Sequence, residues 1–136
     1  MGRINFGPHL VDRKGITDRV TLDNMTLMGW DVHPLPMDGD FLGRIQFWRR
    51  PADRPGNFFR GVFELRGLGD TYLDISDWKK GVVWVNGHNL GRYWEIGPQK
   101  RLYCPASFLK SGRNEIVVFD LHVLRPGRVA GFTDPE

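Results

Sequence analysis

The chain has 136 residues, 40% of them hydrophobic, which is enough apolar material for one domain with a buried core. Its 19 basic and 16 acidic residues give a net charge of +3, and the basic residues are scattered, so we expect no nucleic-acid partner. No apolar run approaches the ~18 residues of a membrane span and no signal peptide is visible, so we expect no membrane partner and assign no compartment. The 17 Gly and 9 Pro punctuate many short segments, which is typical of an all-β protein.

The first part of the chain predicts short strands separated by turns. Residues 16–22 alternate imperfectly and form one predicted strand. Residues 25–32 form the next, with Trp30 as its predicted core anchor. Residues 44–49 fit either a short helix or a strand, and the pattern does not decide between them. The Pro- and Gly-containing run at 51–56 is the predicted boundary before the main sandwich.

From residue 57 the strand pattern becomes regular. Between Phe59 and Leu65, apolar residues and Gly61 occupy one face while mostly charged residues occupy the other, which predicts a strand with a single buried face. Residues 71–75 form the next predicted strand, with Leu73 directed toward the core.

The stretch 82–85, VVWV, has no polar side chain, which predicts a central strand covered on both faces. Asn86 and Gly87 tolerate positive φ and predict a tight turn. We expect residues 88–90 to form a loop and residues 92–94 to begin the returning strand.

The rest of the chain predicts two more strands and a helical turn. Residues 101–104 form a short strand, and Pro105 with Gly112 brackets one helical turn. Residues 115–122 form the last predicted buried strand, and the end of the chain reads as a surface tail.

Several of these motifs together resemble one family, the family 35 glycoside hydrolases or β-galactosidases, in their C-terminal galactose-binding-like β-sandwich. The resemblance rests on GVVWVNG at 81–87, NLGRYW at 89–94, IGPQ at 96–99, LY at 102–103 and NEIVVF at 114–119. Residues 1–7 and 12–15 resemble the end of the all-β domain that precedes this sandwich in the family.

The resemblance implies an all-β fold, a galactose-binding-like jelly-roll β-sandwich. We expect residues 1–136 to form a single module with its core at 57–122. Residues 1–35 would then correspond to the end of the preceding all-β domain, and 123–136 to the tail.

The resemblance does not extend to catalysis. In the family these β domains lean on a catalytic (β/α)₈ barrel, and nothing in the sequence resembles that barrel. A retaining glycosidase needs two carboxyl groups about 5 Å apart, and the four Glu residues are dispersed between strands and turns. We therefore predict no catalytic residue and no enzyme activity. The His residues and the single Cys lack metal-ligand spacing, so we name no metal and no cofactor.

The strongest candidate for a ligand site is the returning strand. A sugar site needs an aromatic platform with fixed donors and acceptors, and the segment 88–94 offers both. A galactose-containing saccharide is the expected ligand. The predicted ligand-binding residues are His88, Asn89, Arg92, Tyr93 and Trp94.

Two alternatives to a sugar site stay open. The aromatic side chains of this strand could be core or interdomain packing, in which case the module is a structural support or docks on the catalytic barrel of a parent enzyme. Residues 1–35 carry many apolar side chains, so we also expect a homodimer with this third of the chain in its interface.

Overall fold

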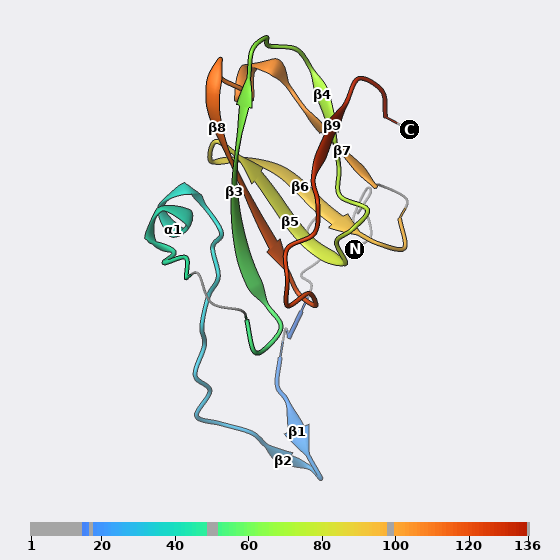
Figure 1. Cartoon of the computed structure of the whole chain (residues 1–136). Coiled ribbons are helices and arrows are strands. Elements are labelled where there is room, and N and C mark those ends of the chain that lie inside the picture. The colour runs from blue at the N-terminus through green and yellow to red at the C-terminus, as the bar shows by residue number, and fades with distance from the viewer. Residues whose placement is uncertain (1–14, 17, 49–51, 98–99, 136) are drawn as a thin grey trace, which may run out of the picture. The chain divides into compact units, whose positions relative to one another are not determined.

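The computed structural model describes residues 15–16, 18–48, 52–97 and 100–135 (Figure 1). The chain divides into two compact units, residues 1–35 and 36–136. The boundary therefore lies upstream of the predicted one at 51–56, because the segment before that run packs on the sandwich.

The larger unit is built from two antiparallel sheets (Figure 1). The four-stranded sheet contains, in spatial order, β3 (Asn57–Leu65), β8 (Gly112–Asp120), β5 (Lys80–Val85) and β6 (His88–Trp94). The three-stranded sheet contains β7 (Arg101–Cys104), β4 (Thr71–Asp74) and β9 (Ala130–Phe132).

The main core lies between these sheets, since both contribute side chains to one apolar cluster. The cluster combines residues of the four-stranded sheet with residues of the three-stranded sheet and of the connecting segments. The all-β sandwich expected from the sequence is confirmed. The buried members are Leu73, Ile75, Trp78, Val83, Val85, Tyr93, Leu102, Cys104, Leu109, Ile116 and Val118.

Strand β5 is covered on both faces, as its apolar sequence predicts. Val83 and Val85 are inaccessible to solvent and point into the main core. Trp84 is also buried, but it belongs to a second cluster with Val117 and Phe119 on the opposite face of the sheet. Successive side chains of a strand point to opposite faces, so one continuous apolar run serves two cores.

The second core is closed by a short helix, α1 (Gly39–Arg44). The Asp38 carboxylate caps it by accepting a hydrogen bond from the backbone N–H of Phe41 at 2.8 Å. The Phe41 and Phe58 rings lie 5.7 Å apart, which joins the helix to the sheet. The sequence left a helix or a strand open at 44–49, and the helix begins earlier because Asp38 supplies its cap. Within the described residues, no helix is long and apolar enough to cross a membrane.

The turn between β5 and β6 is tighter than expected. Asn86 and Gly87 both have positive φ, 49° and 84°, which makes a two-residue hairpin loop. Strand β6 consequently begins at His88, so the predicted loop at 88–90 is wrong. A register shift places Gly91 opposite Val83 and Asn89 opposite Trp84, so the extra residue is accommodated inside the strand.

At the C-terminal end, the short strand β7 and one turn of 3₁₀ helix (Ala106–Phe108) agree with the predictions. The segment described as a surface tail instead contains β9, which pairs with β4. This strand has only three residues, one of them a glycine, and therefore carries no visible apolar alternation. The hydroxyl of Thr71 donates to the carbonyl of Phe132 at 3.0 Å, and Arg101 lies over the Phe132 ring.

In the smaller unit, two strands of two residues each form a hairpin, β1 (Thr21–Leu22) and β2 (Met25–Thr26). The predicted strands at 16–22 and 25–32 are thus much shorter than expected. Trp30 is 59% exposed within this structure, so the expectation that it anchors a core is wrong.

Candidate functional site

The five predicted ligand-binding residues all lie on β6, but they do not converge. Along a strand, side chains alternate between the two faces of the sheet. Tyr93 points into the main core, whereas Arg92 is exposed and Trp94 is half-buried. His88 and Trp94 are six residues apart, which is about 20 Å in an extended strand, so one monosaccharide cannot touch both.

Tyr93 is a structural residue in this arrangement. Its side chain is 3% exposed, and its hydroxyl lies 2.8 Å from Oδ2 of Asp120 and 3.0 Å from the carbonyl oxygen of Phe119. Burial raises the pKa of Tyr93 strongly, and the hydrogen bond to Asp120 raises the pKa further. The hydroxyl therefore stays protonated and acts as a donor inside the fold.

Asp120 is the centre of this buried polar cluster. Its carboxylate also accepts hydrogen bonds from the backbone N–H groups of Lys79, Lys80, His122 and Val123 at 2.7–3.2 Å. Burial alone would raise the pKa of Asp120, but these N–H donors and the Tyr93 hydroxyl outweigh it and lower the pKa. The charged carboxylate is thus stabilised by its donors although no solvent reaches it.

At the start of β6, His88 and Asn89 make local contacts. The Asn89 side chain accepts a hydrogen bond from the backbone N–H of Gly91 at 2.7 Å. The His88 ring stacks on Phe108 with 4.2 Å between ring centroids. Both residues are exposed, and the amide oxygen of Asn89 and one face of the His88 ring already serve the hairpin and the neighbouring turn.

The end of β6 presents a different chemistry. A small hollow of about 170 Å³ lies beside Tyr93, Trp94 and Glu95, and Ile75, Ser76 and Lys100 line it from other segments. The Nζ atom of Lys80 lies 4.1 Å from the centre of the Trp94 ring, a cation–π contact. An indole, a carboxylate, a hydroxyl and an amine therefore meet within one small concavity. The sequence pattern missed Ser76 and Lys100, because only the fold brings them to the end of β6.

The charged groups of this hollow are partly paired. Glu95 forms an ion pair with Lys79, and this contact raises the pKa of the Lys79 ammonium group. The Ser76 hydroxyl donates to Oδ1 of Asp74 at 2.6 Å. Lys100 has no ion pair assigned among the described residues.

A metal or thiol site has no support in the described part of the chain. No group of three His, Cys, Asp or Glu side chains is placed there to hold a metal ion. Burial raises the pKa of the Cys104 thiol to about 11, so this group is neutral at pH 7 and a poor nucleophile.

Comparison with known families identifies two matching regions. Residues 57–114 match the family model described as "Beta-galactosidase, galactose-binding domain". Residues 1–36 match the model described as "Beta-galactosidase, first all-beta domain". The second match ends one residue after the boundary between the two structural units.

Individual relatives agree with these matches. The chain is 36% identical to Beta-galactosidase 1 of Dictyostelium discoideum over 133 residues, 92% of this chain and 20% of the relative. It is 39% identical to human Beta-galactosidase-1-like protein 2 over 125 residues, 88% of this chain and 20% of the relative. It is 45% identical to Beta-galactosidase of Xanthomonas manihotis over 103 residues, 75% of this chain and 17% of the relative. The chain thus spans about one-fifth of the length of these relatives.

The buried Tyr93–Asp120 pair gives the first testable expectation. Tyr93→Phe removes a hydrogen bond to a charged group and should lower the free energy of unfolding by about 1.5–3 kcal/mol at pH 7. Tyr103→Phe, which removes the exposed hydrogen bond to Asp70, is the matched control and should cost much less.

The effect should also depend on pH in a defined direction. Because the pKa of Asp120 is lower in the folded state, its stabilisation is complete above the ordinary value of 3.8 and is lost as the pH falls below it. The difference between the wild type and Tyr93→Phe, measured by urea unfolding, should therefore shrink between pH 6 and pH 3. A difference that stays constant over this range would contradict the role assigned to Asp120.

Proposed function

Because this chain belongs to the β-galactosidases of glycoside hydrolase family 35 and matches their galactose-binding and first all-β domains, we propose that it is a non-catalytic docking module. The surface that docks is the segment 16–35, and its partner is further β structure of the same enzyme family. The observation that carries this proposal is the exposure of large apolar side chains along that segment.

This segment exposes an unusual number of large hydrophobic side chains. Met28 is 86% exposed, and the others are exposed by more than half. Many large apolar side chains exposed along one short segment indicate an interaction site, whereas single exposed hydrophobic residues are ordinary. The exposed residues are Ile16, Leu22, Met25, Met28, Trp30, Val32 and Leu35.

The segment also lacks the means to fold alone. Its hairpin pairs only two residues on each strand, and isolated two-stranded hairpins are marginal in water even when they are longer. None of its described residues is buried within this structure. A partner that covers the segment would supply the missing burial, at about 25 cal/mol for each Å² of apolar surface removed from water.

Membership of this enzyme family suggests which domains could cover the exposed segment. In a protein with the length of the relatives, the segment would complete an all-β domain, and the sandwich would lean on the catalytic barrel. In the isolated chain, the same apolar surface can be covered by a second copy, so we expect a homodimer through this segment. We assign no catalytic residue to the chain.

Light scattering tests the docking surface. The double variant Met28→Asp and Trp30→Asp places two charges on the apolar segment and should convert a dimer into a monomer. Leu68→Asp, at an exposed leucine of the sandwich, is the control and should leave the dimer intact. A wild-type chain that stays monomeric over a hundredfold range of concentration would contradict self-association through this segment.

A second candidate function is weak binding of a galactoside in the hollow at the end of β6. The observation that favours it is the meeting of Trp94 with Ser76, Glu95 and Lys100, since an aromatic surface beside polar groups suits a pyranose. Of the residues expected from the sequence, Tyr93 and Trp94 line this hollow, with Trp94 as the proposed ligand contact, while His88 and Asn89 lie at the other end of the strand.

A nuclear magnetic resonance titration with methyl β-galactoside tests this candidate. The indole N–H signal of Trp94 should shift in a saturable manner, and Trp94→Ala should abolish the saturable shifts at neighbouring residues. His88→Ala should leave them unchanged because His88 is about 20 Å away along the strand. If His88→Ala abolishes binding instead, or if no signal shifts at high millimolar galactoside, this site is excluded.

A further inference from the structure

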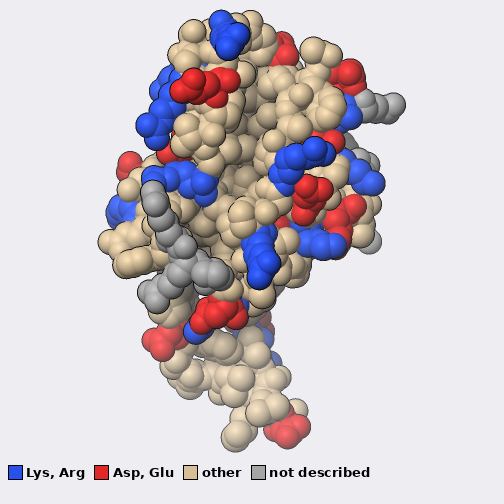
Figure 2. All heavy atoms as spheres, viewed as in Figure 1, with Lys and Arg blue, Asp and Glu red and all other residues tan. Residues whose placement is uncertain are grey.

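A large cavity of the sandwich unit lies away from β6, between the two sheets on the side where β3 and β9 are edge strands. Its volume is about 510 Å³, within the range of small-molecule sites. Figure 2 shows the surface hollowed at this place, between the left and right halves of the sandwich, with uncharged atoms in the hollow and charged side chains on both sides. Among the described strands, β3 pairs only with β8 and β9 only with β4, so no further described strand closes this side.

Glycine residues at inward-facing positions help to create the cavity. Gly61 lies between Phe59 and Phe63 on the inward face of β3, and Gly131 is paired with the buried Leu73 on β9. Neither glycine has a positive φ, so the backbone conformation does not require glycine at these positions. A Cβ atom would lie 3.1 Å from Cγ2 of Ile116 at Gly61 and 3.1 Å from the hydroxyl oxygen of Thr71 at Gly131, so a larger side chain at either position would crowd the cavity wall.

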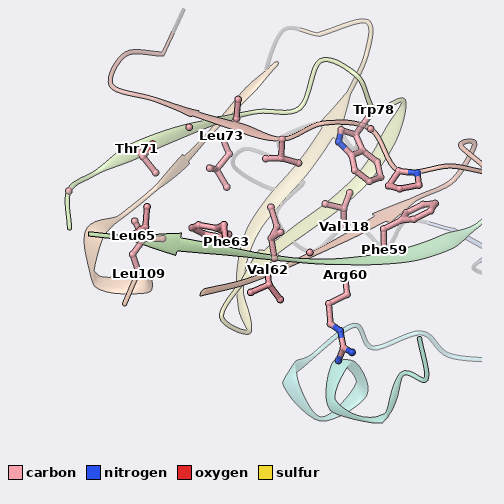
Figure 3. A pocket seen from close by; sticks show the side chains of 18 of the residues that line it. Phe59, Arg60, Val62, Phe63, Leu65, Thr71, Leu73, Trp78, Leu109 and Val118 are labelled. Carbon is pink, nitrogen blue, oxygen red and sulfur yellow. The ribbon is translucent and has the colours of Figure 1, made fainter. Parts of the chain in front are cut away.

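The side chains that line the cavity offer almost no hydrogen-bonding partner to a ligand. The Thr71 hydroxyl is used by the carbonyl of Phe132, and the indole N–H of Trp78 donates to the carbonyl of Arg128 at 3.0 Å. Figure 3 shows that the Arg60 side chain points away from the cavity toward α1, where it lies over the Phe47 ring. No buried side-chain nitrogen or oxygen among the described residues lacks a partner. A sugar, which needs partners for its hydroxyl groups, is therefore unsuited to this cavity.

The shape of the cavity further restricts the class of ligand that it can hold. It follows β3 from Phe59 to Leu65, with Trp78 near one end and Leu109 near the other (Figure 3). Six residue steps along a strand measure about 20 Å, so the volume of 510 Å³ corresponds to a mean cross-section of about 25 Å². A cross-section of this area admits a single hydrocarbon chain.

We propose that this cavity is a binding site for an unbranched aliphatic chain, whose polar head group stays at the solvent-exposed opening. The site is separate from both surfaces considered under the proposed function. An aliphatic chain gains free energy by leaving water and needs no hydrogen bond, which matches a lining of Phe, Leu, Val and Trp side chains.

The test uses a neutral fluorescent probe, N-phenyl-1-naphthylamine, displaced from the full chain by linear alcohols from hexanol to dodecanol. Because the alcohols carry no charge, attraction to charged surface side chains does not contribute to the differences between them. Each added CH₂ should lower the half-displacing concentration about fourfold until the chain fills the cavity. Displacement that does not depend on chain length would mean that the probe sits on exposed apolar surface, and it would overturn the proposal.

A matched pair of variants locates the site. Val129→Phe adds a ring to the cavity wall and should weaken dodecanol displacement by at least tenfold. Glu64→Phe adds a ring at an exposed position of β3 that does not line the cavity, and it should leave displacement unchanged. Equal weakening in both variants would contradict the assignment.

A third variant covers the case in which Val129→Phe fails to fold. Leu65→Trp fills the far end of the cavity and shortens the space for the chain. It should preserve displacement by hexanol and weaken displacement by dodecanol. Unchanged dodecanol displacement in a folded Leu65→Trp protein would overturn the proposal.

Discussion

The sandwich depends on one buried carboxylate. Asp120 ends β8, and its two oxygens accept hydrogen bonds from the backbone at the start of β5, from the β6 side chain Tyr93 and from the chain that leaves β8. A charge with no access to water is tolerated only when donors surround it, and five donors do so here. Three neighbouring strands are thereby fixed at one end of the sheet.

This junction also requires a residue without a side chain. A Cβ atom at Gly81 would lie 1.7 Å from the carbonyl oxygen of Phe119, so β5 and β8 can approach as they do only with glycine at this position. Because β5 is then fixed against its neighbours, the residues after Gly81 alternate between two cores, and Tyr93 on β6 is committed to the interior. Trp94, the next residue, is only half-buried, and it lines the small hollow at the end of β6 together with Tyr93.

Sequence patterns predicted correctly those elements whose structure follows from their own local sequence. The apolar run of β5, the alternation of β3 and the helical turn near Ala106 follow from local periodicity and turn chemistry. The start of β6 was misjudged, because a polar exposed residue such as His88 resembles a loop residue until its strand partner is known. β9 was missed for a similar reason, because the sequence of its three residues does not indicate that it pairs with β4.

The candidate sites were harder to predict than the fold. The expected ligand residues share a strand, but strand alternation and a separation of about 20 Å divide them, and neither follows from a motif alone. Ser76 and Lys100 come from other segments and carry no motif. The cavity between the sheets is lined by residues of both sheets, among them Gly61 and Gly131, which only the fold brings together.

Hydrogen exchange of the isolated chain, followed amide by amide, tests the central claim that the Asp120 junction holds the sandwich together while residues 16–35 depend on a partner. At a concentration where the chain is monomeric, the slowest amides should belong to β5 and β8 and include those of Lys79 and Lys80, whose N–H groups bind Asp120. The amides of residues 16–35 should exchange nearly as fast as in an unfolded peptide. Fast exchange at Lys79 and Lys80, or protection of residues 16–35 equal to that of β5, would contradict this account.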